Sequence, residues 1–468
     1  MPVLLGVVLV GSALAACSGS GPARSSSPPT APAVALPDSP VGAQARWLIA
    51  AMAHLPIADV DVSAHFDAAF LAEVSPPMLN QVLQGFPGMR LVSVEVDQPT
   101  TLVAITSVGA SALHLQASLA VDAEGLISGL RFGAPPPPTT FDGVDAALRS
   151  VAPHVRLLVA AVSNGSCQPL HSIDPGTPAP LGSAFKLYVL HALAAAVASG
   201  KVSWDQPLTI TAQQKSLPSG TLQNEPDGTQ ISVRDVAAKM ISISDNTAED
   251  MLANLVGRPA VEAALTASGM ADPSRDQPFL TTRELFILRL DQWRTLADRY
   301  IAAGEADRRA LLASTIDPAP LPTGPVWTTP RDIDSIEWFA SAKDICGVYA
   351  SLAALARQPG LSPVADVLEI NDGGLELDPT EWQTTWFKGG SEPGVLTLAY
   401  LATTRTGRTY VVVALAENPS APIDETPAEL VMLSAIKGAF TLAARSAAGE
   451  ALTGPGPPDA QPFEIPGA

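Results

Sequence analysis

The spacing of apolar and polar positions divides the chain into a short region of helices and strands and a longer mixed region. In the short region, apolar residues recur at helical spacing and then alternate as in strands, over 44–54 and 68–86 (helices) and 91–96, 101–108, 113–121 and 126–132 (strands). Two helices followed by four strands predict a small α+β domain with a curved antiparallel sheet.

The longer region, from residue 141 to about residue 448, has the pattern of one large domain. It is expected to begin with a hairpin, to continue with long helices and to end with three strands and a helix, over 155–162 with 168–173, then 384–387, 395–403, 410–416 and 428–444. This mixture of helices and strands predicts an α/β (α+β) chain.

Segments rich in Pro, Ser, Ala and Gly separate these regions. Residues 18–40 predict a disordered linker, and four consecutive prolines within 134–140 predict a stiff spacer. We therefore expect a leader, a linker, a small domain, a spacer, a large domain and a flexible tail, at 1–17, 18–40, 41–133, 134–140, 141–448 and 449–468.

The leader is apolar from residue 3 to residue 16 and is too short to span a membrane. It runs into Leu14-Ala15-Ala16-Cys17, which resembles a bacterial lipobox. The resemblance implies that Cys17 is lipidated and that the protein is exported and anchored to the outer face of the bacterial cell membrane. The alternative is an ordinary signal peptide with an incidental cysteine.

Composition narrows the possible functions. The chain of 468 residues is 47% hydrophobic and 16% charged, which excludes wholesale disorder. Its formal net charge of −19, from 27 basic and 46 acidic residues, argues against a nucleic-acid partner and against a polybasic grip on lipid.

Cysteine and histidine usage argues against a metal site. The chain has three cysteines, six histidines and no C-x-x-C or H-E-x-x-H pattern, so neither a structural zinc site nor another cofactor is expected. Cys167 and Cys346 can form a disulfide in an exported protein or remain two buried thiols, and the sequence favours the thiols.

The first motif with chemistry is Ser183-Ala184-Phe185-Lys186, which opens an apolar helix that runs to about Ala198. Residues three apart on a helix share a face, so the Ser183 hydroxyl and the Lys186 amine can meet. A serine needs a base to become a nucleophile, and a buried lysine near positive charge can be that base.

A second copy of this pattern, Ser434-Ala435-Ile436-Lys437, lies inside the final helix. Nothing downstream can complete a site there. We interpret Ser434 as a packing residue and Lys437 as a solvated side chain.

Ser244-Asp245-Asn246 forms the second motif, between a helical pattern over 233–240 and a helix that begins near Thr247. Asp and Asn are also common in turns and helix caps, so the triplet alone favours an ordinary turn. The third motif, Lys388-Gly389-Gly390-Ser391, closes a predicted strand, where glycine lets a ligand approach the backbone. The alternative there is a strand end with a glycine turn.

Together the three motifs resemble the active-site set of the β-lactamase and DD-peptidase superfamily of penicillin-recognising serine enzymes. The resemblance spans residues 141–448 and includes Leu217-Pro218-Ser219-Gly220 and the pair Thr281-Thr282. It implies a β-lactamase/transpeptidase-like domain, in which helices and a helical subdomain flank an antiparallel sheet.

The resemblance also implies a role for each motif residue. Ser183 is the nucleophile, Lys186 is the base in acylation, and Ser244 relays a proton between Lys186, Lys388 and the leaving group.

The remaining implied roles concern substrate binding and support. Asn246, Gly389, Gly390 and Ser391 contact substrate, with the oxyanion between the N–H groups of Ser183 and Ser391, whereas Asp245 braces its loop.

Two departures from the superfamily pattern affect these expectations. Gly389 replaces the usual threonine, which removes a contact to a substrate carboxylate. The long loop that carries a deacylating glutamate in class A enzymes is replaced by residues 270–280, which contain no Glu-x-x-Asn. Glu284 is the nearest glutamate, and we expect it to face solvent. A helical insertion over 293–312 is expected to roof the cleft.

The whole layout resembles the LpqF-type actinobacterial lipoproteins and the β-lactamase-like protein of clavulanic acid gene clusters. The small domain resembles, in element order, the cone-shaped fold of nuclear transport factor 2 and ketosteroid isomerase. A catalytic role for that domain would need a buried acid, and the candidates Asp59, Asp61 and Asp67 are expected to cap helices or face solvent.

These observations predict a lipid-anchored serine hydrolase that acts through an acyl-serine on a β-lactam, ester or amide, with weak β-lactam turnover. Its expected partners are a small-molecule or peptidoglycan-like substrate and a membrane. The alternative is a binding lipoprotein that keeps the site as a ligand pocket.

Overall fold

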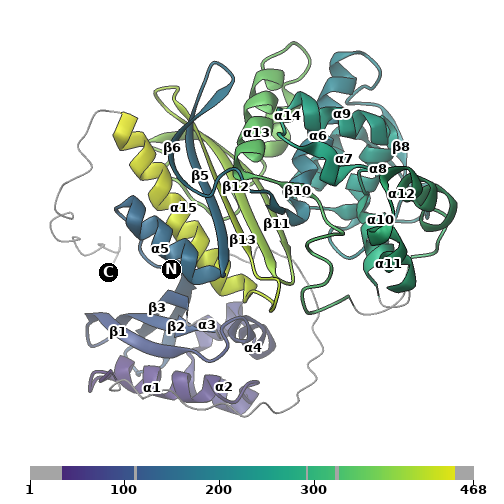
Figure 1. Cartoon of the computed structure of the whole chain (residues 1–468). Helices are drawn as coiled ribbons and strands as arrows, with labels where there is room; N and C mark the ends of the chain where they lie inside the picture. The colour runs from purple at the N-terminus through teal and green to yellow at the C-terminus, as the bar shows by residue number, and fades with distance from the viewer. Residues whose placement is uncertain (1–33, 110–112, 291–293, 322–325, 448–468) are drawn as a thin grey trace.

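The small region consists of four short helices packed on a four-stranded antiparallel sheet, in the order β1-β2-β3-β4 (Figure 1). The computed structural model describes residues 34–109, 113–290, 294–321 and 326–447. The elements of this region are α1 (Pro40–Met52), α2 (Asp59–His65), α3 (Ala68–Glu73), α4 (Pro76–Gln84), β1 (Arg90–Asp97), β2 (Thr101–Val108), β3 (Leu113–Val121) and β4 (Ile127–Gly133). The predicted bounds of β2 and β3 are confirmed.

The single helix predicted over 68–86 is wrong, because the chain forms α3 and α4 instead. Val74 is extended at the end of α3, and Pro76 begins α4 after Ser75. Proline fits the first turn of a helix but cannot continue one, so the apolar periodicity extends across a break.

The acids of the small region have the expected structural roles. Asp67 caps α3 by accepting a hydrogen bond from the Phe70 N–H at 2.6 Å, and Asp59 and Asp61 are exposed in the first turn of α2. The cavity found under this sheet is lined almost wholly by apolar side chains and has a volume of about 40 Å³. None of the three acids lines it.

A five-stranded antiparallel sheet forms the centre of the large region, in the order β11-β12-β13-β5-β6. Its strands are β5 (His154–Ser163), β6 (Ser166–Ile173), β11 (Trp382–Glu392), β12 (Val395–Thr404) and β13 (Thr409–Glu417). β11 is an edge strand and is longer than predicted. Residues 388–391 lie inside it and pair with β12, so the alternative of a glycine turn there is wrong.

Helices cover both faces of this sheet (Figure 1). One face holds α5 (Phe141–Val151) and α15 (Glu425–Ala447), and the other holds the helical region. The principal helices of that region are α6 (Lys186–Ala198), α7 (Val233–Ser242), α8 (Asn246–Val256), α9 (Arg258–Ala267), α10 (Thr282–Arg289), α11 (Arg294–Ala302), α12 (Glu305–Leu311), α13 (Ala342–Ala356) and α14 (Pro363–Leu368).

Alternate residues of the central strands contribute to two separate cores. Leu398 and Tyr400 of β12 face α15, whereas Ala399 and Leu401 face the helical region. A strand that is buried on both faces has an almost continuous apolar sequence, as β12 and β13 do.

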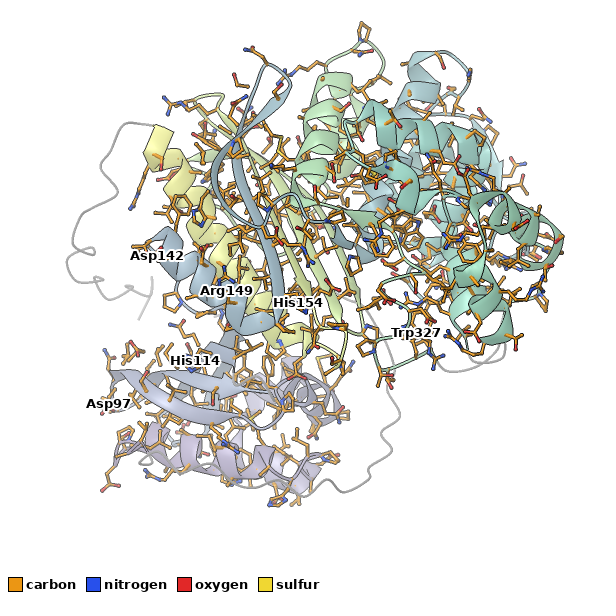
Figure 2. The ribbon with its side chains drawn as sticks, viewed as in Figure 1. Asp97, His114, Asp142, Arg149, His154 and Trp327 are labelled. Carbon is orange, nitrogen blue, oxygen red and sulfur yellow. A yellow bond between two sulfur atoms is a disulfide. The ribbon has the colours of Figure 1, made fainter. Side chains whose placement is uncertain are left out.

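The core on the α15 side continues into the small region, because β3 packs against α15. Figure 2 shows the two sides of this junction, with Asp97 and His114 on the small sheet and Asp142 and Arg149 on α5. By length and composition α15 could cross a membrane, but most of it is buried between these layers, as expected of a core helix.

The proline-rich spacer also packs on α15. Ser434 donates a hydrogen bond to the Pro136 carbonyl at 3.2 Å, and a Cβ on Gly438 would lie 2.6 Å from the Pro138 carbonyl oxygen. The interpretation of the second Ser-x-x-Lys copy as packing is confirmed for Ser434.

A disulfide joins Cys167 of β6 to Cys346 of α13, with the two Cα atoms 6.3 Å apart. The favoured alternative of two buried thiols is therefore wrong. The two cysteines are 179 residues apart in sequence, so no local pattern could have indicated that they form a disulfide.

Candidate active site

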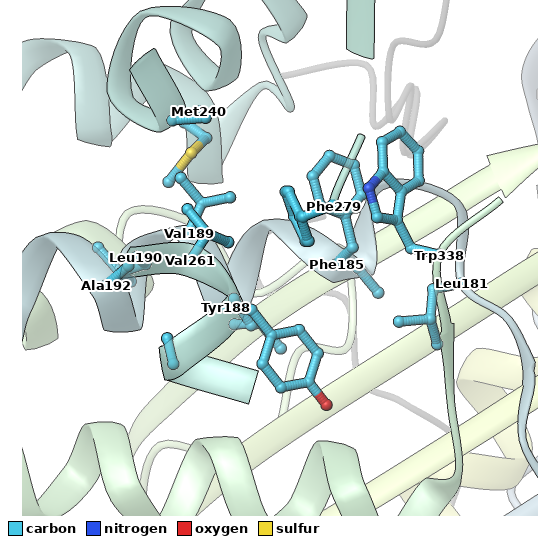
Figure 3. Close-up of a cluster of buried hydrophobic side chains, with 14 of the residues drawn as sticks. Leu181, Phe185, Tyr188, Val189, Leu190, Ala192, Met240, Val261, Phe279 and Trp338 are labelled. Atoms are coloured by element: carbon cyan, nitrogen blue, oxygen red, sulfur yellow. The ribbon is translucent and has the colours of Figure 1, made fainter. Parts of the chain in front are cut away.

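Ser183 lies in a tight 3-10 turn, Gly182–Phe185, that leads directly into α6. Aromatic packing fixes this turn, since Phe185 stacks on Trp338 with ring centroids 3.5 Å apart, and Phe279 lies beside both rings (Figure 3). The buried Glu337 side chain accepts a hydrogen bond from the Gly182 N–H at 2.7 Å. The nucleophile turn is thus supported from both its apolar and its polar sides.

Lys186 is the first residue of α6 and its side chain is fully buried. Its Nζ lies 3.2 Å from Ser183 Oγ, 3.1 Å from Ser244 Oγ, and 2.6 Å from both the Ser244 carbonyl oxygen and Asn246 Oδ1. The last two atoms can only accept, so they take two N–H donors. The nitrogen lone pair of a neutral amine is then left for the hydroxyl groups.

Burial shifts Lys186 toward that neutral form. Desolvation lowers the pKa of its amine from 10.5 to about 8, and the nearby Glu249, Asp245 and Asp250 oppose the shift only in part. A lysine with such a pKa can accept a proton near neutral pH, as a general base must.

Ser244 sits in the short connection between α7 and α8, with a positive φ of 55°. Non-glycine residues rarely adopt this conformation, and active sites are among the places where such strain is found. Asp245 holds the connection in place: its Oδ1 caps α8 at the Ala248 N–H, and its Oδ2 accepts the N–H groups of Thr221 and Leu222. Asp245 therefore braces the loop, as its implied role requires.

Lys388 approaches Ser244 from β11. Its Nζ lies 3.1 Å from Ser244 Oγ and 2.6 Å from the Gly389 carbonyl oxygen, and its side chain is buried. Burial and the neighbouring Lys186 hold the pKa of the Lys388 amine well below its usual range. The Ser244 hydroxyl thus lies between two amines.

Two glycines without side chains, Gly182 and Gly390, allow the backbone of β11 to pack closely against the nucleophile turn. A Cβ on Gly390 would lie 2.6 Å from the Ser183 nitrogen and 2.7 Å from the Ala184 nitrogen, and a Cβ on Gly182 would lie 2.8 Å from the Ser391 nitrogen. The backbone N–H groups of Ser183 and Ser391 are therefore close neighbours. Paired N–H groups of this kind can stabilise an oxyanion.

Sequence comparison matches two parts of the chain to known families. Residues 144–309 match the model of the Beta-lactamase enzyme family, and residues 36–127 match the model described as ORF 12 gene product N-terminal. No curated protein matches the chain.

The large region has the β-lactamase fold.

Solved structures similar to the β-lactamase-like region are distant in sequence. A β-lactamase from Sphaerobacter thermophilus is 21% identical and covers 66% of this chain and 98% of its own, with a TM-score of 0.46. A β-lactamase from Chitinophaga pinensis is 20% identical (65% and 98% covered, TM-score 0.46), and PBP-A is 18% identical (66% and 99% covered, TM-score 0.43).

A cavity of about 590 Å³ opens in front of Ser183. Its wall includes all three motifs and an aromatic side formed by Phe185, Phe286, Trp327 and Trp338. Such a volume is typical of sites for small molecules.

Asn246 lines this cavity, but both ends of its amide are used within the protein. Its Oδ1 accepts from Lys186, and its Nδ2 donates to the Leu217 carbonyl oxygen at 2.5 Å. In this state the side chain orients the Lys186 amine, and the second N–H of its Nδ2 can donate to a substrate without displacing Leu217.

The expectation that Glu284 faces solvent is wrong. Glu284 is 2% exposed, forms a capping box with Thr281, and is ion-paired with Arg258. It does not line the cavity, and neither does any residue from 270 to 280. The buried carboxylate is explained by an arginine more than twenty residues away, which the local sequence does not reveal.

The predicted roof is also wrong. Among the described residues, none of α11 or α12 lines the cavity, because Leu296, Ala297 and Tyr300 of α11 turn into the helical core. Leu285, Phe286 and Arg289 of α10 and the segment Val326–Trp327 form this wall instead. Trp327 is labelled in Figure 2 beside the helical region.

Five charged residues of the cavity wall were missed by the sequence analysis. They are Arg289, Glu337, Glu392, Glu425 and Glu429. The first three form a buried network, in which Arg289 Nη1 lies 3.3 Å from Glu337 and 2.7 Å from Glu392. Glu425 and Glu429 lie four residues apart on the apolar helix α15. Two acids on one face of an apolar helix were the one local sequence signal for this part of the wall.

Proposed function

We propose that this protein is a serine hydrolase that works through an acyl-serine on an ester, amide or β-lactam, with weak β-lactam turnover. The observation that carries the proposal is the buried Lys186 amine, which lies 3.2 Å from Ser183 Oγ and 3.1 Å from Ser244 Oγ. A pocket that only binds a ligand has no need of a nucleophile paired with a base.

Acylation follows from this geometry. Neutral Lys186 takes the Ser183 hydroxyl proton as Oγ attacks the carbonyl carbon, and the N–H groups of Ser183 and Ser391 stabilise the oxyanion. Ser244 then donates its proton to the leaving group and takes one from Lys186, as the bond from the carbonyl carbon to the leaving group breaks. Each oxyanion donor of this kind is typically worth ~3 kcal/mol.

Deacylation is the weak half of this reaction. Residues 270–280 contribute no side chain to the cavity, so no carboxylate of that loop can activate water. We propose that Lys186 serves both halves, and loss of a dedicated base typically costs about 10²–10⁴-fold. We therefore propose that turnover of β-lactams is limited by deacylation.

The absence of a carboxylate from residues 270–280 in the cavity wall also favours a second candidate, a binding protein that keeps the cavity with little catalysis. The missing loop carboxylate supports it, because an acyl-enzyme without a water base persists. The two candidates differ in whether product accumulates beyond one equivalent.

Exposure of the protein to a fluorescent penicillin and to an activated ester, with labelling and turnover followed together, separates the candidates. We expect multiple turnovers of the ester, with either a long-lived penicilloyl adduct on Ser183 or no reaction with penicillin, by mass spectrometry. Rapid hydrolysis of a chromogenic cephalosporin without an adduct would show that another residue replaces the loop glutamate.

We also propose that Cys17, which lies outside the described residues, anchors the protein to the outer face of the cell membrane. The lipobox-like segment supports this, as does the resemblance of the sequence layout to that of the LpqF-type lipoproteins. Replacement Cys17→Ala should release or mislocalise the protein in a fractionation experiment. An unchanged membrane fraction would contradict the anchor and leave the catalytic proposal untouched.

A further inference from the structure

The cavity in front of Ser183 is lined by residues from both faces of the sheet near β11, including the face that packs on α15. Phe387 of β11 belongs to the core on that face, so strand alternation places Gly389 and Ser391 on the same side. Glu425 and Glu429 of α15 line the cavity there, together with Leu396 and Leu398. We call Ser391, Glu425 and Glu429 the acidic end of the cavity.

Two carboxylates share this end. Glu425 and Glu429 are four residues apart and therefore lie on one face of α15. Ser391 Oγ donates a hydrogen bond to Glu425 Oε1 at 2.5 Å, so the hydroxyl is directed at a carboxylate. Burial, with Glu425 beside it, raises the pKa of Glu429 to about 7.

The two cationic side chains of the described cavity wall, Lys388 and Arg289, are bonded to groups other than Glu425 and Glu429. Lys388 is bonded to Ser244 and to its own strand, and Arg289 is fully buried between Glu337 and Glu392. Among the described parts of the chain, neither Glu425 nor Glu429 forms an ion pair. The acidic end therefore holds two carboxyl groups with no paired cation, of which Glu429, with its pKa of about 7, is only partly ionised at neutral pH.

The cavity wall also contains an unpaired polar group, on the face of β12 that points toward the helical region. Thr397 of β12 lines the cavity, its side chain is fully buried, and its hydroxyl has no hydrogen-bond partner within the described chain. A buried hydroxyl without a partner costs free energy unless a ligand or water satisfies it.

We propose that this site takes esters or amides that carry a cationic amine or quaternary ammonium group close to the scissile carbonyl, and that it discriminates against a carboxylate at the same position. The spacing is short because Ser391 supplies both the oxyanion N–H and the hydroxyl that binds Glu425. The aromatic side of the cavity receives the apolar part of the substrate. This inference rests on the proposed acyl-serine chemistry.

The test uses three thioesters of phenylacetic acid whose thiol part ends in trimethylammonium, in the isosteric neutral tert-butyl group, or in carboxylate. Thiol release gives kcat/KM for each. We expect kcat/KM of the cationic thioester to exceed that of the anionic one by at least about tenfold, since like charges brought together in a binding site repel. Equal values, or a preference for the carboxylate, would overturn the inference.

Two variants assign the preference to the acidic end. In Glu425→Gln/Glu429→Gln the ratio of the cationic to the anionic value should fall at least about tenfold, whereas Glu381→Gln, which removes an exposed acid outside the cavity, should keep the ratio. An unchanged ratio in the double variant would contradict the assignment.

Binding of the same three compounds to Ser183→Ala, measured by calorimetry, separates this inference from the proposed function. Tighter binding of the cationic compound supports the inference even if the native protein releases no thiol, in which case the hydrolase proposal fails. Equal or tighter binding of the anionic compound overturns the inference, whatever the turnover.

Discussion

Ser183 and Lys186 show how much one helical turn can do at the scale of the residue. Their spacing places hydroxyl and amine on one side of the turn, and contacts from distant segments hold them 3.2 Å apart. Ser434 and Lys437 have the same spacing, but Ser434 is bonded to the Pro136 carbonyl oxygen and does not line the cavity. The environment therefore decides which copy is reactive.

Replacement Ser183→Ala should abolish labelling by serine-directed probes and reduce ester hydrolysis at least about 10³-fold, because the attacking oxygen is lost. Ser434→Ala is the matched control and should retain both labelling and activity. Both are read by probe fluorescence on a gel and by initial rates. Labelling retained in Ser183→Ala would refute the nucleophile.

The pKa of Lys186 predicts the pH dependence of the reaction. Burial lowers this pKa to about 8, so the neutral base forms as pH rises through 8. Ester kcat/KM should therefore increase with pH, about tenfold per unit below 8, and level off above it. The rate measured with Ser183→Ala at each pH is subtracted, to remove ester hydrolysis that does not depend on the nucleophile. A flat profile from pH 6 to 9 would contradict Lys186 as the base.

At the scale of the element, the site depends on how closely β11 packs on the nucleophile turn. Gly390 has the Leu181 carbonyl oxygen and the Ser183 and Ala184 nitrogens where a Cβ would be. These are backbone atoms, so they cannot move aside as a flexible side chain would. The double glycine of the third motif is thus a packing requirement as well as a way for substrate to reach the strand.

Replacement Gly390→Ala should push β11 away from the turn and separate the two oxyanion donors. We expect a loss of at least about 10²-fold in kcat/KM, as for misplacements of this size. The free energy of unfolding should fall by about 1–3 kcal/mol from overpacking. Gly176→Ala, where a Cβ would meet nothing closer than 4.0 Å, is the control for both measurements. Wild-type rates in Gly390→Ala would contradict this account of the site.

At the scale of the whole molecule, one disulfide ties the outer strand β6 to α13. The two cysteines are 179 residues apart, so the bond closes a loop that contains most of the helical region. Cross-links of this kind stabilise mainly by restricting the unfolded chain, and more so for longer loops.

Reduction, or the variant Cys167→Ser/Cys346→Ser, should lower the free energy of unfolding by about 2–5 kcal/mol. Ester hydrolysis at 25 °C should change little, since neither cysteine lines the cavity. Denaturant titration with and without reductant measures the effect. Alkylation of both thiols in unreduced protein would show that the bond does not form.

Much of this protein could be predicted from the sequence because its determinants are local. The bounds of β2 and β3 follow from the alternation of apolar and polar residues. The capping role of Asp245 follows from the preference for aspartate at the residue before a helix, where its side chain accepts a backbone N–H of the first turn. The placement of Ser183 and Lys186 on one side of a turn follows from helix geometry. Ser244 is 58 positions from Lys186 and 144 positions from Lys388, so no local rule brings these residues together. Their meeting could be expected only from the family resemblance.

The tertiary structure decided what depends on contacts between distant segments. Glu284 is buried because Arg258 pairs with it, the cysteines bond because β6 and α13 pack together, and Arg289 joins Glu337 to Glu392 across the cavity wall. The charge of the acidic end arises in the same way, when the edge of β11 meets the first turns of α15. A hydrophobic pattern specifies which face of an element is buried, but not which element covers it, and the chemistry of this cavity depends on that second choice.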